Sequence, residues 1–309
     1  MKVGEEMSKS VKALIILNPY SGKIKMKKNL YDIINVFNRN GYETTLFCTS
    51  SPKEAEKEII ENAHLYDVVI CCGGDGTLSE VISGIIQAKL KIPIGLIPTG
   101  TTNDVAKTLC LPKSLLKTIE VITHGSITNY DIGQLDENKY FSYIASFGAF
   151  SAVSYTTPQW LKNKFGYFAY TLEGIKGIGD IKPYKVKIET NVANFEGEFI
   201  FGSITNSTSV GGLVTLPDDK VSLNDGFFEV MLIPHPKSPA DLHKILKGLR
   251  TKRYDINGIY FTHTNHIKFT FDNDVKWVTD GEFGGQYKKV EIRVIKEKVK
   301  IFSSLTEKR

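Results

Sequence analysis

The stretch CCGGDGTLSEVISGI, residues 71–85, joins the end of an apolar segment to the start of an amphipathic one. Residues 67–72, DVVICC, read as a buried strand, and residues 77–88, TLSEVISGIIQA, read as a helix. A strand that ends in glycines and runs into a helix exposes backbone N–H groups at the helix N-terminus, where the helix dipole also favours an anion. The stretch therefore predicts a phosphate-binding turn between a strand and its helix.

The aspartate inside this turn carries the chemical information. Gly73, Gly74 and Gly76 let the backbone approach an anion closely, and Thr77 can cap the helix or bind a phosphate oxygen. Asp75 alone would repel a phosphate, so a cation between them is needed, and Mg²⁺ is the usual one. The plainer alternative is a glycine turn in which Asp75 only caps the helix. Neither GxxxxGK[ST] nor GxGxxG is present, which disfavours a P-loop enzyme.

Two further polar loops follow apolar strands in the same part of the chain. NPYSG, residues 18–22, comes after ALIIL, and PTGTTNDVAKTL, residues 98–109, comes after IPIGLIP. The carboxyl ends of parallel strands share one edge of a sheet, and ligands of open α/β sheets bind there. The three loops therefore predict one nucleotide site.

Length and periodicity predict two domains, because 309 residues exceed what a single core usually serves. Residues 8–128 alternate apolar strands with helices, which predicts a doubly wound parallel α/β nucleotide-binding domain. Residues 129–290 show alternating runs separated by turns, which predicts an antiparallel β-sandwich domain. Two helices are expected within that second part, over 158–176 and 238–250.

Composition narrows the class of protein. The chain is 41% hydrophobic and 24% charged with a net charge of +5, which is typical of a globular protein and compatible with a nucleotide or an anionic membrane surface. We expect no nucleic-acid partner. The four cysteines lack metal-binding spacing, and no signal peptide or membrane-spanning stretch is visible, so we expect a cytoplasmic protein that contacts a membrane only peripherally.

The motifs NPYSG, GGDGTLSEVISG and IPTGTTNDVAKTL, in this order and spacing, resemble the diacylglycerol kinase catalytic domain, with the bacterial soluble lipid kinases as the nearest match. The resemblance continues through GGLVTLPDDKVSLNDGFFEV at 211–230 and TDGE at 279–282, so it covers nearly the whole chain. GGDG alone also occurs in NAD kinases and phosphofructokinases. The GTTND loop and the late NDGFFEV and DGE motifs are what indicate lipid kinases.

The resemblance implies roles for individual residues. Carboxylates that organise the catalytic Mg²⁺ through a water network would be Asp75, Asp104 and Asp131, and the general base would be Glu282. On local sequence alone, Glu282 reads as an ordinary turn acid, and Asp280 is its rival for the role of base. The positions that match ATP contacts are Asn18, Pro19, Tyr20, Ser21, Gly22, Thr49, Gly73, Gly74, Asp75, Gly76, Thr77, Leu78, Ser79, Glu80 and Thr101.

The resemblance also implies a second, structural Mg²⁺ in the β domain. Asp225 would supply a carboxylate, and Ser222 and Phe227 would supply backbone carbonyls. Asn-Asp-Gly is equally a standard hairpin turn, so only the family supports a metal there. The chain departs from the family at Lys107, where an arginine is common, and at Asp219, which replaces a small residue beside this site.

The resemblance implies an ATP-dependent lipid kinase that works in a cleft between the two domains, with diacylglycerol as the default substrate and phosphatidic acid as the product. The last strand, about 296–306, would return to the first domain. Other lipids, such as phosphatidylglycerol, a sphingoid base or a polyprenol, stay open. The alternatives are a kinase for NAD or a sugar phosphate, and a nucleotide-binding, membrane-associated regulator without turnover. Exposed strand edges are compatible with a homodimer.

Overall fold

A computed structural model gives the fold and describes residues 10–21, 25–137, 139–148, 182–207, 209–210, 214–215, 222–251 and 258–305. The chain divides into two compact units. Unit 1 comprises residues 1–100, 109–128 and 300–309, and unit 2 comprises residues 101–108 and 129–299. Within the described ranges, no helix combines the length and the apolar character needed to cross a membrane.

Unit 1 is built on parallel strands in the order β2, β1, β3 and β4. The strands that lie inside this sheet read as continuous apolar runs, because helices bury both of its faces. The C-terminal end of β15 lies beside β4, with Ile301 opposite Ile94. The bounds are Val11–Leu17 for β1, Tyr42–Cys48 for β2, Val68–Gly73 for β3, Ile94–Pro98 for β4 and Glu282–Ser303 for β15.

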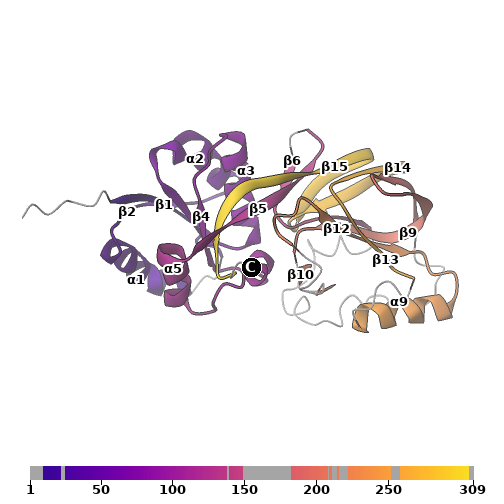
Figure 1. Ribbon diagram of the computed structural model, residues 1–309, viewed down its shortest axis with the longest axis horizontal. Helices are drawn as coiled ribbons and strands as arrows, with labels where there is room; N and C mark the ends of the chain where they lie inside the picture. The colour runs from indigo at the N-terminus through magenta and orange to yellow at the C-terminus, as the bar shows by residue number, and fades with distance from the viewer. Residues whose placement is uncertain are drawn as a thin grey trace, which may run out of the picture. The chain divides into compact units, whose positions relative to one another are not determined.

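Helices cover the two faces of this sheet (Figure 1). On one face, Ile33 and Phe37 of α1 and Ile119 and Ile122 of α5 pack against side chains of β1, β3 and β4. On the other face α2 packs against α3, closely enough that a Cβ on Gly84 would lie 2.7 Å from the side chain of Ile59. The bounds are Lys25–Arg39 for α1, Glu54–Asn62 for α2, Ala63–Leu65 for the short η1, Asp75–Gln87 for α3 and Leu115–His124 for α5.

Unit 2 contains mostly antiparallel strands and two described helices, of which α9 is the helix predicted over 238–250. The helix predicted over 158–176 lies outside the described residues. The bounds are Asp104–Thr108 for α4, Ser126–Leu135 for β5, Lys139–Phe141 for β6, Ile144–Gly148 for β7, Tyr184–Thr190 for β8, Asn194–Thr205 for β9, Ser209–Val210 for β10, Val214–Thr215 for β11, Phe228–Pro234 for β12, Pro239–Thr251 for α9, Tyr260–Thr264 for β13 and His266–Thr279 for β14.

The main sheet of unit 2 runs in the order β13, β12, β9, then β7 and β8 together, then β14, β15, β5 and β6. Both β7 and β8 pair with β9 and with β14. The sequence predicted two facing sheets, whereas here the two ends of one hydrogen-bonded sheet approach each other. Phe141 of β6 lies 5.6 Å from Phe228 of β12, measured between ring centroids.

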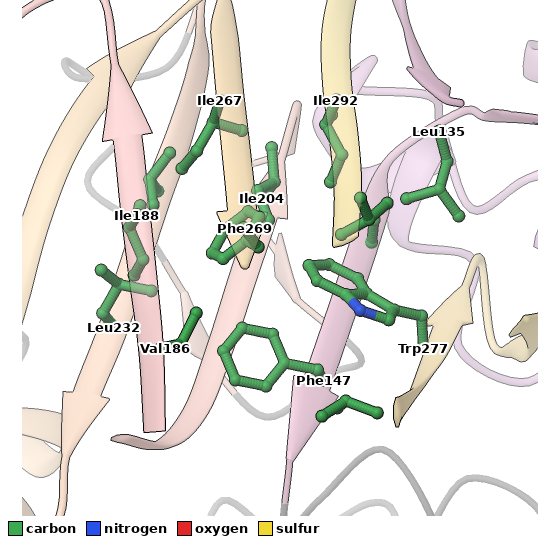
Figure 2. Packing of buried hydrophobic residues seen from close by; sticks show 14 of the residues in the cluster. Leu135, Phe147, Val186, Ile188, Ile204, Leu232, Ile267, Phe269, Trp277 and Ile292 are labelled. Carbon is green, nitrogen blue, oxygen red and sulfur yellow. The ribbon is translucent and has the colours of Figure 1, made fainter. Parts of the chain in front are cut away.

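Aromatic rings fill the core that this curled sheet encloses, as Figure 2 shows. Phe147 lies 5.0 Å from Trp277 and 5.6 Å from Phe269 between ring centroids, in tilted and edge-to-face arrangements. Aromatic pairs in such geometries contribute about 0.5–1.5 kcal/mol beyond the area they bury. Ile188, Ile204 and Leu232 point into the same core. The packing on this face of the sheet therefore stabilises unit 2.

The outer face of this sheet carries one strongly connected carboxylate, Glu291. Its Oε1 lies 2.6 Å from His266 Nε2 and 2.7 Å from Arg293 Nε, and its Oε2 lies 3.5 Å from Lys268 Nζ. The hydrogen bonds from Arg293 and then that from His266 lower the pKa of Glu291 to about 2.

We expect Glu291→Gln to lower the free energy of unfolding at neutral pH by about 1 kcal/mol, because it removes the charge that these partners bind. The loss should be no larger because Glu291 and its partners are partly exposed to solvent. A lowered folded-state pKa stabilises the fold above the ordinary glutamate pKa, and this contribution disappears as the pH falls towards 2. The difference in the free energy of unfolding between wild type and variant, measured in urea, should therefore shrink below pH 4.5. A difference in the free energy of unfolding that stays constant from pH 7 to pH 2.5 would contradict this expectation. The control variant is Glu189→Gln, because the Glu189 carboxylate contacts Lys187.

Candidate functional site

Four loops of unit 1 lie at the carboxyl ends of its parallel strands. They follow β1 at Asn18–Ser21, β2 at Thr49, β3 at Gly74 and β4 at Thr99–Gly100. Side chains join them: Asn18 Nδ2 donates to Thr77 Oγ1 at 3.0 Å, and Thr99 Oγ1 donates to Ser21 Oγ at 3.0 Å. The structure therefore brings together the three loops that the sequence placed at one edge.

Asn18 connects two of these loops through its backbone and its side chain. Its N–H donates to Cys72 O at 3.0 Å, and its Oδ1 accepts from Tyr20 N at 3.0 Å, which makes an Asx turn. Its side-chain Nδ2 donates to Thr77 in the first turn of α3. Asparagine suits this position because it offers a donor and an acceptor on one short side chain.

The glycines of the turn have a packing reason. A Cβ on Gly74 would lie 3.2 Å from Gly100 Cα and 3.7 Å from Ser21 Oγ, so the loops after β1, β3 and β4 converge on this residue. Asp75 is the first residue of α3, and Thr77 in the same turn is buried. The backbone N–H groups of this first turn and the helix dipole form a site where an anion is favoured.

Other residues predicted to contact ATP have additional structural duties. The Glu80 carboxylate accepts hydrogen bonds from Lys53 N at 3.0 Å and Ala55 N at 3.3 Å, so it caps the start of α2 from α3. Leu78 is fully buried and its N–H donates to Gly74 O at 3.1 Å, so a contact of this residue with ATP stays a prediction. Gly22 lies outside the described residues, and a role of Glu80 in ATP binding stays a prediction.

Asp104, Asp131 and Glu282 all belong to unit 2, whereas Asp75 belongs to unit 1. Asp104 begins α4 and is fully buried, with its Oδ1 at 3.1 Å from Lys107 Nζ. The same helix is attached to the end of β9, because Thr108 Oγ1 bonds both Asp104 O at 3.0 Å and Ser207 Oγ at 2.8 Å.

Asn206, next to Ser207, continues this connection to Asp131. Its Nδ2 donates to Asp131 O at 2.9 Å and to Leu223 O at 3.4 Å, and its backbone carbonyl accepts from Tyr130 Oη at 3.2 Å. Asp131 N in turn donates to Leu223 O at 2.8 Å. One buried hydrogen-bond chain therefore ties the helix of Asp104, the strand of Asp131 and the loop 222–227 together.

The carboxylate of Asp131 holds two backbone segments. Oδ2 accepts from Gly226 N at 2.7 Å and Oδ1 accepts from Glu297 N at 2.6 Å, and the residue is fully buried. Burial raises the pKa of Asp131, the two hydrogen bonds oppose this increase, and the nearby Asp225 adds to it.

The loop predicted to hold the structural metal is a tight turn. Asp225 Oδ1 accepts from Phe227 N at 2.9 Å, and Ser222 Oγ contacts Asn224 Oδ1 at 3.4 Å. Within the described ranges, no group of three or more His, Cys, Asp or Glu side chains could hold a metal ion. One carboxylate with backbone carbonyls is still an all-oxygen donor set, which suits Mg²⁺. Asp219 lies outside the described residues.

TDGE forms the two-residue hairpin between β14 and β15. Thr279 pairs with Glu282, and Asp280 and Gly281 have φ angles of 50° and 86°, which is the type I′ geometry that Asp-Gly favours. The Glu282 side chain is exposed at this turn. Asp280 is buried, and its carboxylate accepts from Ser142 N, Ser142 Oγ, Tyr143 N and Ile144 N at 2.6–3.1 Å.

One buried acid was missed by the sequence analysis. Glu229 in β12 is 1% exposed, and burial raises its pKa to about 8. The signal was present in FFEVMLI, where a single glutamate interrupts an apolar run that reads as a strand buried on both faces.

Comparisons with known proteins show the family of this chain. The protein-family model of the diacylglycerol kinase catalytic domain matches residues 12–135 of this chain. The diacylglycerol kinase of Bacillus subtilis (strain 168) is 33% identical over 297 residues, covering 93% of this chain and 97% of that protein. The diacylglycerol kinase of Staphylococcus aureus (strain MRSA252) is 34% identical over 284 residues, covering 89% and 87%.

Solved structures show the same fold. A crystal structure of a diacylglycerol kinase from Bacillus anthracis (strain Sterne) has a TM-score of 0.80 at 21% identity, covering 96% of this chain and 98% of that one. The chain therefore belongs to the diacylglycerol kinase catalytic-domain family.

The anchoring of Asp280 can be tested by stability. Asp280→Asn replaces one acceptor oxygen by an amide group that cannot accept the N–H groups of residues 142–144, so we expect a loss of about 2–3 kcal/mol in the free energy of unfolding. Urea denaturation measures it, with the exposed Asp274→Asn as a matched control expected to change little. Equal stabilities of the two variants would contradict this role.

Proposed function

We propose that the protein transfers the γ-phosphoryl group of ATP to a lipid hydroxyl, with diacylglycerol as the first candidate substrate and phosphatidic acid as the product. The observation that supports this most is the joined set of loops around Gly74, in a chain 33% identical to a diacylglycerol kinase over nearly its whole length. Lipid contact would be peripheral, from the aqueous side of a membrane.

ATP binding is assigned to unit 1. The first turn of α3 would bind phosphate oxygens through its backbone N–H groups, which Gly74 leaves accessible. The Asn18–Thr77 hydrogen bond holds this turn against the loop after β1, and the Thr99–Ser21 bond holds that loop against the one after β4. These bonds would keep the donors in position without the nucleotide. Preorganised donors of this kind stabilise charge that develops during transfer.

Glu282 is assigned as the general base. Asp280, its rival, has both carboxylate oxygens engaged with the 142–144 backbone, and it is buried. Glu282 is the exposed acid of the same rigid turn, and a carboxylate there can take the proton of a lipid hydroxyl during in-line attack. Asp280 would then be the residue that fixes the position of the turn.

Mg²⁺ is the metal we assign to the phosphoryl transfer, where it would neutralise charge on the phosphate oxygens. Asp75 and Asp104 would hold it. Asp131 would contribute only through water, since both of its oxygens already accept backbone hydrogen bonds. The all-oxygen donor chemistry fits Mg²⁺.

These assignments predict that Asp75→Ala and Glu282→Gln abolish turnover of Mg·ATP and diacylglycerol, by at least about a hundredfold, while leaving the fold intact. Initial rates in mixed micelles and thermal unfolding are the two measurements. The exposed Glu196→Gln is the matched control and should retain wild-type rates. Wild-type turnover by Glu282→Gln would remove that residue from the role of base.

The structural metal has a separate test that does not need activity. Mg²⁺ should raise the melting temperature of the wild type, and the rise should grow with the Mg²⁺ concentration, because an ion that binds only the folded state stabilises it. The shift should be absent in Asp225→Ala and preserved in Asp274→Ala. An equal shift in Asp225→Ala would show that the ion binds elsewhere.

A further inference from the structure

The strand that begins with the proposed base contains a β-bulge. In the hairpin of β14 and β15, Val278 lies opposite Phe283, but the next residue of β14, Trp277, lies opposite Gly285. Over this step β15 therefore has one residue more than β14, and the extra residue is Gly284. Bulges of this kind are common beside active sites, where they change the direction of a side chain.

The bulge decides on which face of the sheet Glu282 lies. Trp277 points into the aromatic core (Figure 2), and Thr279, which is two positions further along β14, shares its face. Glu282 lies opposite Thr279, and Tyr287 lies opposite the core residue Val275, so both belong to the core face. An odd number of positions separates Glu282 from Tyr287, which would put them on opposite faces of a regular strand. If Tyr287 kept its place, loss of the bulge would therefore turn Glu282 to the other face.

Two side chains bind the carbonyl group of the extra residue. Lys139 Nζ, from β6, donates to Gly284 O at 2.7 Å, and Tyr287 Oη donates to the same oxygen at 3.1 Å. The extra residue of a bulge does not take part in the regular ladder, and Gly284 is buried, so its carbonyl group needs partners of this kind. The charged donor makes the stronger of the two bonds. Lys139 and Tyr287 therefore stabilise the bulged register over the regular one.

The two donors also contact each other and the glycines of the bulge. Lys139 Nζ lies 5.9 Å from the centroid of the Tyr287 ring, which is a cation–π distance. A Cβ on Gly285 would lie 2.5 Å from Cε2 of Tyr287, and Gly285 has a φ of 127°, a conformation that favours glycine. A Cβ on Gly284 would lie 3.0 Å from Cγ2 of Thr279. The bulge is therefore closely packed on the core side.

We propose that Lys139 and Tyr287 are positioning residues for the phosphoryl transfer, because their hydrogen bonds to Gly284 O keep the bulge that places Glu282 on the core face. The inference rests on the proposed function, in which Glu282 takes the proton of the lipid hydroxyl. Asp280 fixes the turn before Glu282, and the bound carbonyl group fixes the strand after it. Because unit 1 is proposed to bind ATP, loss of these contacts should lower kcat and leave the KM for Mg·ATP unchanged.

Lys139→Met removes the charged donor and keeps the length of the side chain. We expect its kcat with diacylglycerol in mixed micelles to fall about tenfold, because a misplaced catalytic group loses rate steeply. Tyr287→Phe loses only the weaker donor and should lower kcat less, whereas Lys139→Arg keeps a charged donor and should retain most of the wild-type rate. The matched control is Lys276→Met, which removes an exposed lysine of β14 opposite Gln286 and should keep the wild-type rate. Thermal unfolding checks that each variant is folded at the assay temperature.

A double-mutant cycle with Glu282→Gln separates positioning of the base from a general structural effect. Lys139→Met should leave the residual rate of Glu282→Gln unchanged, because no base then remains to be positioned. An equal fall in both backgrounds, or a wild-type kcat in Lys139→Met, would overturn the inference while the low rate of Glu282→Gln continues to support the proposed function. Wild-type turnover by Glu282→Gln would instead remove the proposed base, and the inference with it.

Discussion

The buried carboxylate of Asp131 is the constraint on which the predicted chemistry of unit 2 depends. It accepts hydrogen bonds from Gly226 and Glu297, and so joins β5 to the turn of Asp225 and to β15. Removing one partner of such a group leaves a desolvated charge, which costs several kcal/mol. Asn206 extends the connection towards the helix of Asp104 through Ser207 and Thr108. The carboxylates of unit 2 therefore keep their positions because the backbone around them is fixed by hydrogen bonds, not because side chains happen to meet.

Hydrogen bonding separates the acids of this chain into two kinds. The carboxylates of Asp280 and Asp131 accept hydrogen bonds from backbone N–H groups, and that of Glu80 caps α2. These three acids therefore stabilise the fold. Glu282 stands exposed on a hairpin that Asp280 makes rigid. Glu229 is buried with an oxygen that the protein does not use.

Much of unit 1 was predictable, because its signals are local. Apolar runs, glycines and the polar residues that follow them predicted β1, β3 and β4 and the loops at their ends. The Asp-Gly turn before Glu282 was readable for the same reason. The partners of Asp131 were not, since Gly226 and Glu297 lie 95 and 166 residues away in sequence. The sequence could not predict that unit 2 forms one curled sheet. Apolar and polar residues alternate with a period of two both in a sandwich and in a single curved sheet. The roles of Asp75, Asp104 and Asp225 as metal ligands stay predictions.

The central claim is that this chain phosphorylates a lipid. The alternative is a kinase with a similar ATP site that phosphorylates a soluble molecule. The most direct measurement is the partition of label after the purified protein is incubated with Mg²⁺, radiolabelled ATP and, in separate reactions, a panel of glycerolipids, NAD and a sugar phosphate, followed by extraction into chloroform. Our account predicts label in the organic phase with a glycerolipid and none transferred to NAD or sugar phosphate. Label that stays in an aqueous product of NAD or a sugar phosphate, with every lipid unlabelled, would contradict it.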